Sequence, residues 1–225
     1  MTLFLELVRS PRRGAAACLE RGSLPIAAAA VGAATAITAL SVGRFAGQVS
    51  VQDVMFGPQR SPLVGLLVSL LGRDLTVVVL HLLEQSWAAL LIVSALGPMW
   101  IWLLGASAIH AAARLGGSGH PFRPMLVLVG MATGLSRACA DLVALAAGAR
   151  GPGAAVAQLA GLLALGWLGI VALRGIERHY GVDAARAFTV LALAVVLFYL
   201  VPLILIAAAV VAIVVAAVVL KYVPG

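Results

Sequence analysis

Arg137 and Asp141 are the two residues whose types and spacing point most directly to chemistry in this chain. They lie four residues apart within the apolar stretch 125–149. On a helix this spacing places the guanidinium and the carboxylate on one face, where they can pair. An unpaired charge at the centre of a bilayer costs about 2.5–3.5 kcal/mol on insertion scales, so we expect the pair to face the interior of a helix bundle.

Three interpretations of this pair are open from the sequence. The first is a self-neutralised pair that locks its helix against the neighbouring helices. The second is a polar site for an ion, a proton or a lipid headgroup, and the third is a contact with a helix of a partner subunit. One pair does not define a transport path, because transporters usually add further intramembrane ionisable groups and broken helices.

The same stretch contains Gly130 and Gly134, whose spacing lets two helix backbones approach closely. We expect this contact to lie within the protein's own bundle rather than in a dimer. The span is therefore predicted to be a central helix that does not face lipid. Thr133 and Ser136 flank the two glycines and are candidates for hydrogen bonds across the contact.

Signatures of catalysis or metal binding are weak in this sequence. Ser107 and His110 lie in GASAIH, which is similar to the Gly-x-Ser of intramembrane serine proteases. However, they share one helix, whereas catalytic partners usually converge from different elements. The histidines are scattered along the sequence, and neither HExxH nor a carboxylate cluster accompanies them. We therefore expect no enzyme, no cofactor and no metal site, and Cys18 and Cys139 predict no disulfide.

Composition determines what kind of elements carry these residues. The chain has 225 residues, of which 63% are hydrophobic and 10% are charged, whereas soluble domains carry about 25% charged residues. Apolar runs long enough to cross a bilayer recur, and they do not alternate with polar residues as the strands of a membrane barrel do. The sequence predicts an all-α, polytopic transmembrane helix bundle.

The predicted bundle has about five spans in a single membrane domain, residues 1–225. The spans are expected at 24–43, 87–111, 125–149, 154–173 and 188–220. The last run is interpreted as one long helix, kinked near Pro202. Residues 62–85 are ambiguous, because two apolar halves flank Gly72, Arg73 and Asp74.

Basic residues indicate the orientation, because cytoplasmic loops of membrane proteins are enriched in Lys and Arg. If residues 62–85 do not span, nine basic residues lie inside and five lie outside; if they do span, six lie inside and seven outside. The first arrangement predicts a cytoplasmic N-terminus, with 62–85 as an interfacial or re-entrant segment. The net charge of +7 is then explained by orientation and anionic lipids, and not by nucleic acid.

Three stretches of the chain resemble bacterial members of the Yip family, the multi-span membrane proteins named after Ypt/Rab-interacting proteins. The N-terminal LVRSPRRGAAACLERGSLP resembles a short entry helix that begins at Ser10 and Pro11. The exit of the second span resembles the family through His110, Gly116, Gly117 and Phe122, and the region after the fourth span through Gly175, Tyr180 and Gly181. The chain departs from the pattern in its longer segment 44–85, and the Arg137–Asp141 pair matches no family motif.

The resemblance implies a non-enzymatic protein of the bacterial inner membrane. Bacterial members look like partners that assist other membrane complexes, such as exporters. The expected function is an accessory or assembly subunit, with membrane lipids and other integral membrane proteins as partners. The alternative is a small transporter or a lipid-handling protein that uses Arg137 and Asp141.

Overall fold

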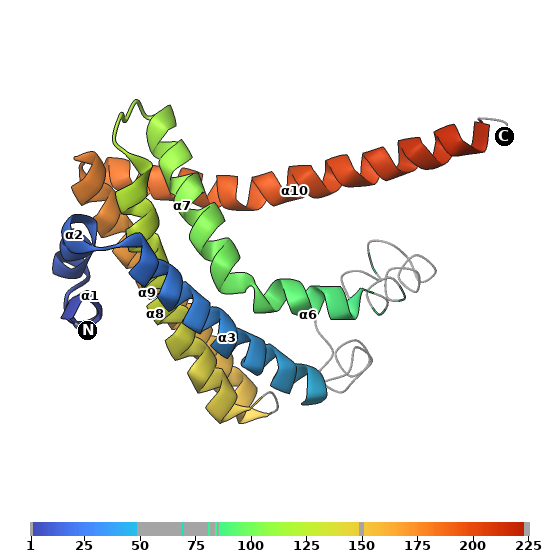
Figure 1. Cartoon of the computed structure of the whole chain (residues 1–225), viewed down its shortest axis with the longest axis horizontal. Helices are drawn as coiled ribbons and strands as arrows, with labels where there is room; N and C mark the ends of the chain where they lie inside the picture. Colours follow the sequence, from blue (N-terminus) through green and yellow to red (C-terminus); the bar gives the residue numbers. More distant parts are fainter. Residues whose placement is uncertain are drawn as a thin grey trace.

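The part of the chain that the structure describes is helical, with no strand. A computed structural model describes residues 2–48, 86–148 and 151–222, together with Ser69, His81 and Glu84. Its helices are α1 (Thr2–Arg9), α2 (Pro11–Arg21), α3 (Leu24–Gln48), α6 (Trp87–Ala95), α7 (Gly97–Leu115), α8 (Phe122–Ala147), α9 (Pro152–Tyr180) and α10 (Ala184–Tyr222). The predicted all-α helix bundle is confirmed (Figure 1).

The number of membrane spans agrees with the prediction. The described helices long and apolar enough to cross a membrane are α3, α8, α9 and α10, and α6 with α7 makes a fifth candidate if the pair counts as one span. The predicted interfacial segment 62–85 lies outside the described residues. The helices that flank it, α3 and α6, pack against each other, so the chain leaves α3 and enters α6 at the same end of the bundle (Figure 1).

The second span differs from the prediction of one helix over 87–111. It consists of α6 and α7, which meet at Leu96 with a bend of 62°. The break falls immediately before Gly97 and Pro98, at the start of α7. Proline donates no backbone hydrogen bond and disfavours helical geometry in the residue before it, and glycine is a weak helix former, so helix α6 ends there.

Pro202 has a different effect, because α10 continues through it without interruption from Ala184 to Tyr222. Pro98 is preceded by Gly97, whereas Pro202 lies between Val201 and Leu203. These two residues have less backbone freedom than glycine and favour the helix more. One long helix is thus confirmed for the last run, and the kink expected near Pro202 does not interrupt it. At 1.5 Å per residue, α10 is about 58 Å long, which exceeds the hydrocarbon core of a bilayer.

The centre of the bundle is α8, as the sequence predicts. The most apolar window of α8 is 61% buried, whereas those of α3, α9 and α10 are 22%, 11% and 11% buried. Helices α3 and α9 pack on α8, and α7 covers α8 as well. Met125, Leu128 and Met131 of α8 are fully buried in the core of the protein.

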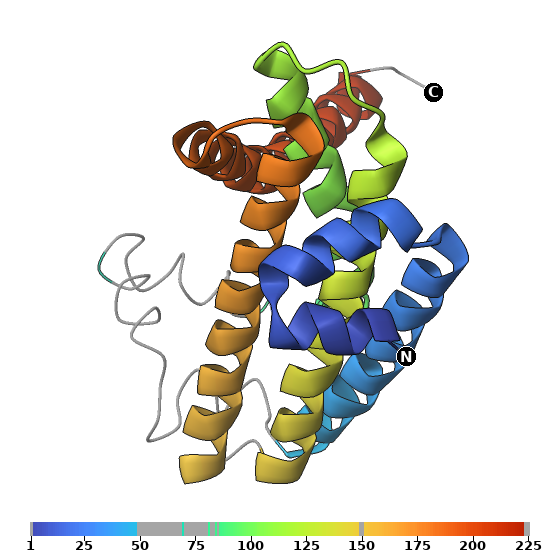
Figure 2. The ribbon, with the colours of Figure 1, turned by 90° about the vertical axis from the view of Figure 1, so that its left-hand side faces the viewer.

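Helices α1 and α2 form a hairpin that crosses in front of α8 and α9 (Figure 2). The hydroxyl of Ser10 accepts a hydrogen bond from the backbone N–H of Arg13 at 3.5 Å, and Pro11 opens α2. Serine caps and a proline in the first turn are favourable at a helix start. A Cβ atom at Gly14 would lie 2.3 Å from the Cα of Leu7, so only glycine lets the two helices cross this closely.

Helix α10 runs crosswise to α8 and α9 and extends beyond them (Figures 1 and 2). It contacts the bundle through α7 and α9 near its start. Ala187 and Ala194 are buried there, whereas Phe188, Val196 and Tyr199 are exposed. The short alanine side chains allow α10 to approach α7. Val190, Leu191, Leu193, Leu197 and Phe198 are partly buried against the core, and the other described side chains of α10 are mostly exposed.

The close approach of α8 to α3 gives a test of this packing. An added Cβ at Gly134 would lie 2.7 Å from the backbone carbon of Ala30 in α3, whereas at Gly166 of α9 it would meet nothing within 4 Å. Replacing Gly134 by Ala should therefore lower the free energy of unfolding by about 1–3 kcal/mol, measured by denaturant titration in detergent. Gly166→Ala is the matched control and should cost nothing; equal stability of the two variants would contradict the described α3–α8 contact.

The thiol of Cys18 in α2 gives a second test, because it is only 1% exposed. Burial, with a smaller effect of the Glu6 carboxylate, raises the pKa of Cys18 to about 11 from an ordinary 9.0, while Arg21 opposes the shift. A raised pKa means that the thiol stays protonated, and hence unreactive, until the pH approaches the folded value. In a Cys139→Ala background, maleimide labelling should stay slow between about pH 7.5 and 9.5 and become fast after unfolding in SDS.

The same shift affects stability. Its contribution to folding is present below the unfolded pKa of 9.0 and is lost as the pH rises through the folded value of about 11.

The labelling experiment has one contrary outcome. If the labelling rate rises with pH in the folded protein as it does in the unfolded chain, the α1–α2 hairpin leaves Cys18 accessible.

Candidate functional site: a polar stripe between α3 and α8

Arg137 and Asp141 form the predicted ion pair inside the bundle. The Nη2 of Arg137 donates to Oδ1 of Asp141 at 2.9 Å, and the side chains are 21% and 10% exposed. The second carboxylate oxygen accepts a hydrogen bond from the hydroxyl of Thr38 in α3 at 2.5 Å. Thr38 thereby joins the charged pair of α8 to the neighbouring helix, and both oxygens of Asp141 have a partner.

Thr133, Arg137 and Asp141 follow one another at intervals of four residues, so they line one face of α8. Together with Thr38 we call them the polar stripe. Two atoms in it are buried without a hydrogen-bond partner among the described residues, the hydroxyl oxygen of Thr133 and Nε of Arg137. A buried polar group without a partner costs about 1–3 kcal/mol, so the stripe is not optimised for stability alone.

Gly130 and Gly134 lie at the same contact. A Cβ atom at Gly130 would meet Nε1 of Trp102 at 2.6 Å and Ala27 at 3.0 Å, and one at Gly134 would meet Ala30. Both glycines therefore pack within the protein's own bundle. The hydrogen bond across the contact comes from Thr38, whereas Ser136, one of the two expected candidates, donates to the carbonyl of Thr133 in its own helix.

The geometry favours the first of the three interpretations, a lock. The hydroxyl of Thr38 has one proton, which it shares between Asp141 and the carbonyl oxygen of Ala34 at 2.8 Å. The carboxylate receives one donor from its own helix and one from α3, while the glycines hold the two backbones together. Sequence reasoning missed Thr38, because the contact joins residues 103 positions apart; the only signal was a threonine within an apolar run.

A second cluster lies where α7, α8 and α9 meet, and it contains residues of the resemblance described above. His110 shares a hydrogen bond with the hydroxyl of Tyr180 (3.1 Å), and its ring lies 5.0 Å from that of Phe122. His120 and His179 lie against Tyr180, at ring distances of 5.9 and 4.7 Å. Three of the histidines that are scattered along the sequence are thus close together in space, since the turns after α7 and α9 bring them to one place.

The imidazoles of His120 and His179 in this histidine–tyrosine cluster make hydrogen bonds to neighbouring residues. Nε2 of His179 donates to the carbonyl of Pro121 at 2.8 Å, and Nδ1 of His120 lies 3.1 Å from the hydroxyl of Ser118. No group of three or more His, Cys, Asp or Glu side chains in the described part of the chain is arranged to hold a metal ion. The cluster ties the helix ends together through rings and single hydrogen bonds.

The glycines of the resemblance surround this cluster and have physical roles there. Gly117 and Gly181 have φ values of 85° and 64°, which L side chains rarely adopt, and they lie at the start of the turns after α7 and α9. Gly116 caps α7. A Cβ atom at Gly175 would lie 2.1 Å from Leu128, so this glycine lets α9 pack on α8.

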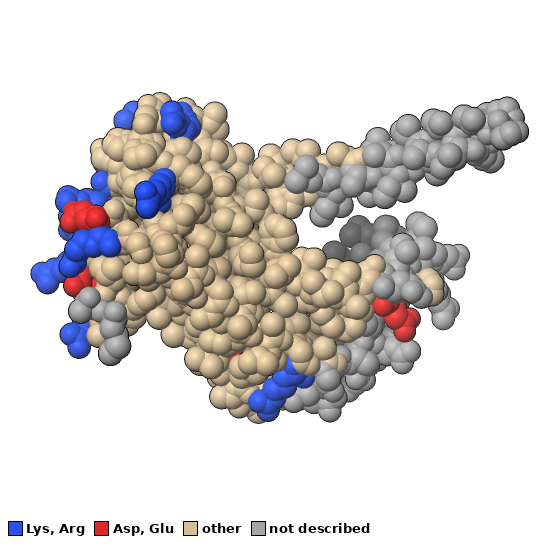
Figure 3. All heavy atoms as spheres, in the orientation of Figure 1, with Lys and Arg blue, Asp and Glu red and all other residues tan. Residues whose placement is uncertain are grey.

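Charged residues gather at the same end of the molecule, over α1, α2 and the ends of α7–α10 that meet there (Figure 3). The nine arginines assigned to the inside belong to these elements. They are Arg9, Arg12, Arg13, Arg21, Arg114, Arg123, Arg174, Arg178 and Arg186. We call this the basic end. Only four acidic residues accompany them, Glu6, Glu20, Glu177 and Asp183, which leaves a net charge of +5.

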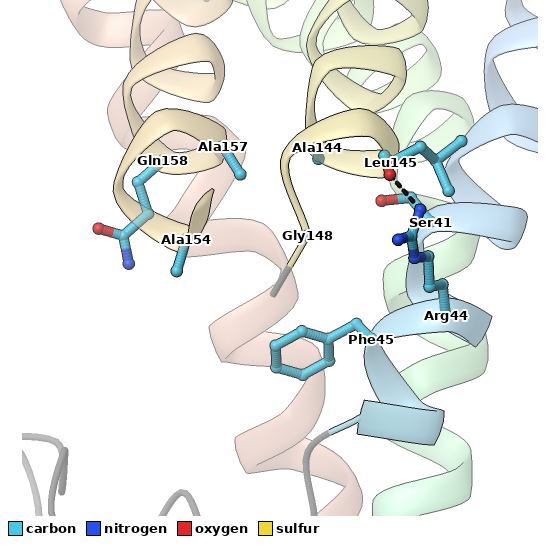
Figure 4. A pocket seen from close by; sticks show the side chains of 9 residues that line it. All are labelled: Ser41, Arg44, Phe45, Ala144, Leu145, Gly148, Ala154, Ala157 and Gln158. Atoms are coloured by element: carbon cyan, nitrogen blue, oxygen red, sulfur yellow. Dashed lines mark hydrogen bonds between the residues drawn. The ribbon is translucent and has the colours of Figure 1, made fainter. Parts of the chain in front are cut away.

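The opposite end has a small cavity of about 170 Å³ where α3, the end of α8 and the start of α9 meet (Figure 4). Its lining is mostly apolar, with Arg44 and Gln158 as the larger polar residues. Arg44 points to α8 and donates a hydrogen bond to the carbonyl oxygen of Leu145 in its last turn (Figure 4). A cation at this position satisfies a free carbonyl and interacts favourably with the helix dipole.

No protein-family model, curated protein or solved structure matches the chain. The resemblance to the Yip family therefore stays a prediction that rests on the residues quoted above.

The hydrogen bond between Thr38 and Asp141 can be tested with two threonines of the same helix. Thr38→Val should lower the free energy of unfolding by about 1.5–3 kcal/mol, because a charged acceptor loses its donor. Thr35→Val is the matched control, since the buried hydroxyl of Thr35 has no partner among the described residues. It should leave stability unchanged or raise it. A Thr38→Val protein as stable as the Thr35→Val protein would show that the stripe does not join α3 to α8.

Proposed function

We propose that this protein is a non-catalytic subunit of the bacterial inner membrane that assists or assembles another membrane complex, such as an exporter, through contacts between helices. The observation that carries the proposal is the position of α10. This helix is the most apolar candidate span, with a mean hydropathy of 2.7 over Ala184–Ile204, yet only 11% of that window is buried within the chain.

The direction of α10 supports a protein partner. Lipid is sufficient cover for an apolar helix that crosses the bilayer beside its neighbours. Because α10 runs crosswise to α8 and α9 (Figure 1), no single bilayer plane suits all three helices equally well. A second membrane protein that packs along α10 would give its apolar surface cover in this position. Large apolar and aromatic side chains of α10 are exposed and available to such a partner. They include Phe188, Tyr199 and Leu203, which are 64%, 70% and 63% exposed.

The basic end supports the proposed orientation. Its nine arginines lie together, whereas Arg44 lies at the opposite end of the described bundle, in the last turns of α3. Enrichment of arginine on one side favours a cytoplasmic location for that side, and hence for the N-terminus. The polar stripe fits the same function, because the hydrogen bond from Thr38 to Asp141 joins α3 to α8 and stiffens the bundle that carries α10.

A photocrosslinking experiment tests the proposal. We place a benzoylphenylalanine at Tyr199 of α10 in cells, and at Leu162 of α9 as the matched control, because the two side chains are 70% and 67% exposed. The residue at position 199 should crosslink to one membrane protein, which should also co-elute in stoichiometric amount from a mild-detergent purification and be identified by mass spectrometry. The residue at position 162 should crosslink mainly to lipid.

Equal crosslinking patterns at the two positions would contradict the role of α10. A chain that purifies without any stoichiometric protein and crosslinks only to lipid would contradict the accessory function itself.

A further inference from the structure

The basic end contains a cavity next to the histidine–tyrosine cluster. It has a volume of about 600 Å³ and lies between the end of α7, the turn that follows it and the start of α10. Cavities that hold small molecules usually measure about 300–1,000 Å³. Its polar lining comes from Ser118, His120, Tyr180 and Arg186, and its apolar lining includes Leu115, Val190 and Leu193.

Arg186 supplies the positive charge of this cavity. Its backbone N–H donates to Oδ1 of Asp183 at 2.8 Å, so Asp183 serves as the cap of α10. The other acidic residues of the basic end are paired elsewhere: Glu6 with Arg21, Glu20 with Arg178 and Glu177 with Arg174. The guanidinium of Arg186 forms no ion pair with any described residue, so it is free to bind an anion from outside the chain.

The polar groups beside Arg186 are hydrogen-bonding groups that suit an anion's oxygen atoms. Ser118 and His120 lie on the turn after α7 and contact each other at 3.1 Å. The cavity lining thus includes a guanidinium, a hydroxyl and an imidazole. Phosphate oxygens are strong acceptors for this set of donors, and arginine binds them with two parallel hydrogen bonds.

The apolar part of the lining is suited to an acyl chain. Leu115, at the end of α7, is 74% exposed. Val190 and Leu193 continue the apolar lining one and two turns beyond Arg186 on α10. An amphiphile therefore meets a cationic site first and an apolar wall next, in the order in which a phospholipid carries its phosphate and its chains.

We propose that this cavity binds one anionic phospholipid of the leaflet at the basic end, with its phosphate on Arg186 and an acyl chain along Val190 and Leu193. The inference is independent of the proposed accessory role, since it concerns the junction of α7 and α10 and not the exposed side of α10. The bound lipid would fill the space between these two helices and so stabilise their contact.

Native mass spectrometry of the full-length protein, titrated with phosphatidylglycerol in a mild detergent, tests the proposal. The wild-type protein should retain one phosphatidylglycerol more tightly than further copies. Arg186→Gln should weaken this first binding event about tenfold, as expected for the loss of one charge-assisted contact. Arg12→Gln is the matched control: Arg12 also lies at the basic end, but it lines a different cavity, against α9.

A second variant tests the cavity itself. Thr189 lines the cavity and its own side chain is exposed, so Thr189→Trp fills the cavity with little risk to folding, and it should reduce the tight binding as Arg186→Gln does. Inorganic phosphate in millimolar excess should fail to displace the lipid, because it cannot use the apolar wall.

Each outcome decides a part of the proposal. Equal weakening by Arg186→Gln and Arg12→Gln would mean that lipids bind the basic end by diffuse charge, and would overturn the site. Unchanged binding in Thr189→Trp would show that the lipid does not occupy this cavity. Full displacement by inorganic phosphate would show a site for phosphate alone and not for a lipid.

Discussion

The charged pair on α8 is the constraint on which the rest of the bundle depends. A helix with Arg137 and Asp141 near its middle is stable in a bilayer only if the two charges are paired and shielded from lipid. The pairing comes from the helix itself, and the shielding requires that α3 approach closely enough for Thr38 to reach Asp141. Gly134 makes that approach possible, because a Cβ atom there would lie 2.7 Å from the backbone of Ala30. The central position of α8 follows from these requirements.

The two ends of the bundle are built differently. At the basic end, the turns after α7 and α9 bring His110, Tyr180 and Phe122 into contact, and arginine outnumbers the acidic residues. At the opposite end, Arg44 closes the last turn of α8 by a single hydrogen bond to a backbone carbonyl. The first end offers charge and hydrogen-bonding groups to anionic partners, whereas the cavity described at the second end has a mostly apolar lining.

The bundle also shows how much a proline's effect depends on its neighbours. Pro98 follows a glycine and coincides with a bend of 62° between α6 and α7, whereas Pro202 lies within an unbroken helix of branched apolar residues. The bend directs α7 toward α8 and the start of α10. The unbroken α10 extends beyond the bundle. Proline thus coincides with a bend that shapes the core at position 98, whereas at position 202 the helix continues and leaves an extended apolar surface.

What the sequence determined by itself is local or periodic. The apolar runs predict the spans, the spacing of four predicts that Arg137 and Asp141 pair, and the glycine spacing predicts a close helix contact, because each depends on helix geometry alone. Tertiary structure decided which helices meet. Thr38 and Asp141 are 103 residues apart and His110 and Tyr180 are 70 apart. The direction of α10 was equally inaccessible, because a helix that is apolar on every side carries no pattern to indicate which face packs against its neighbours.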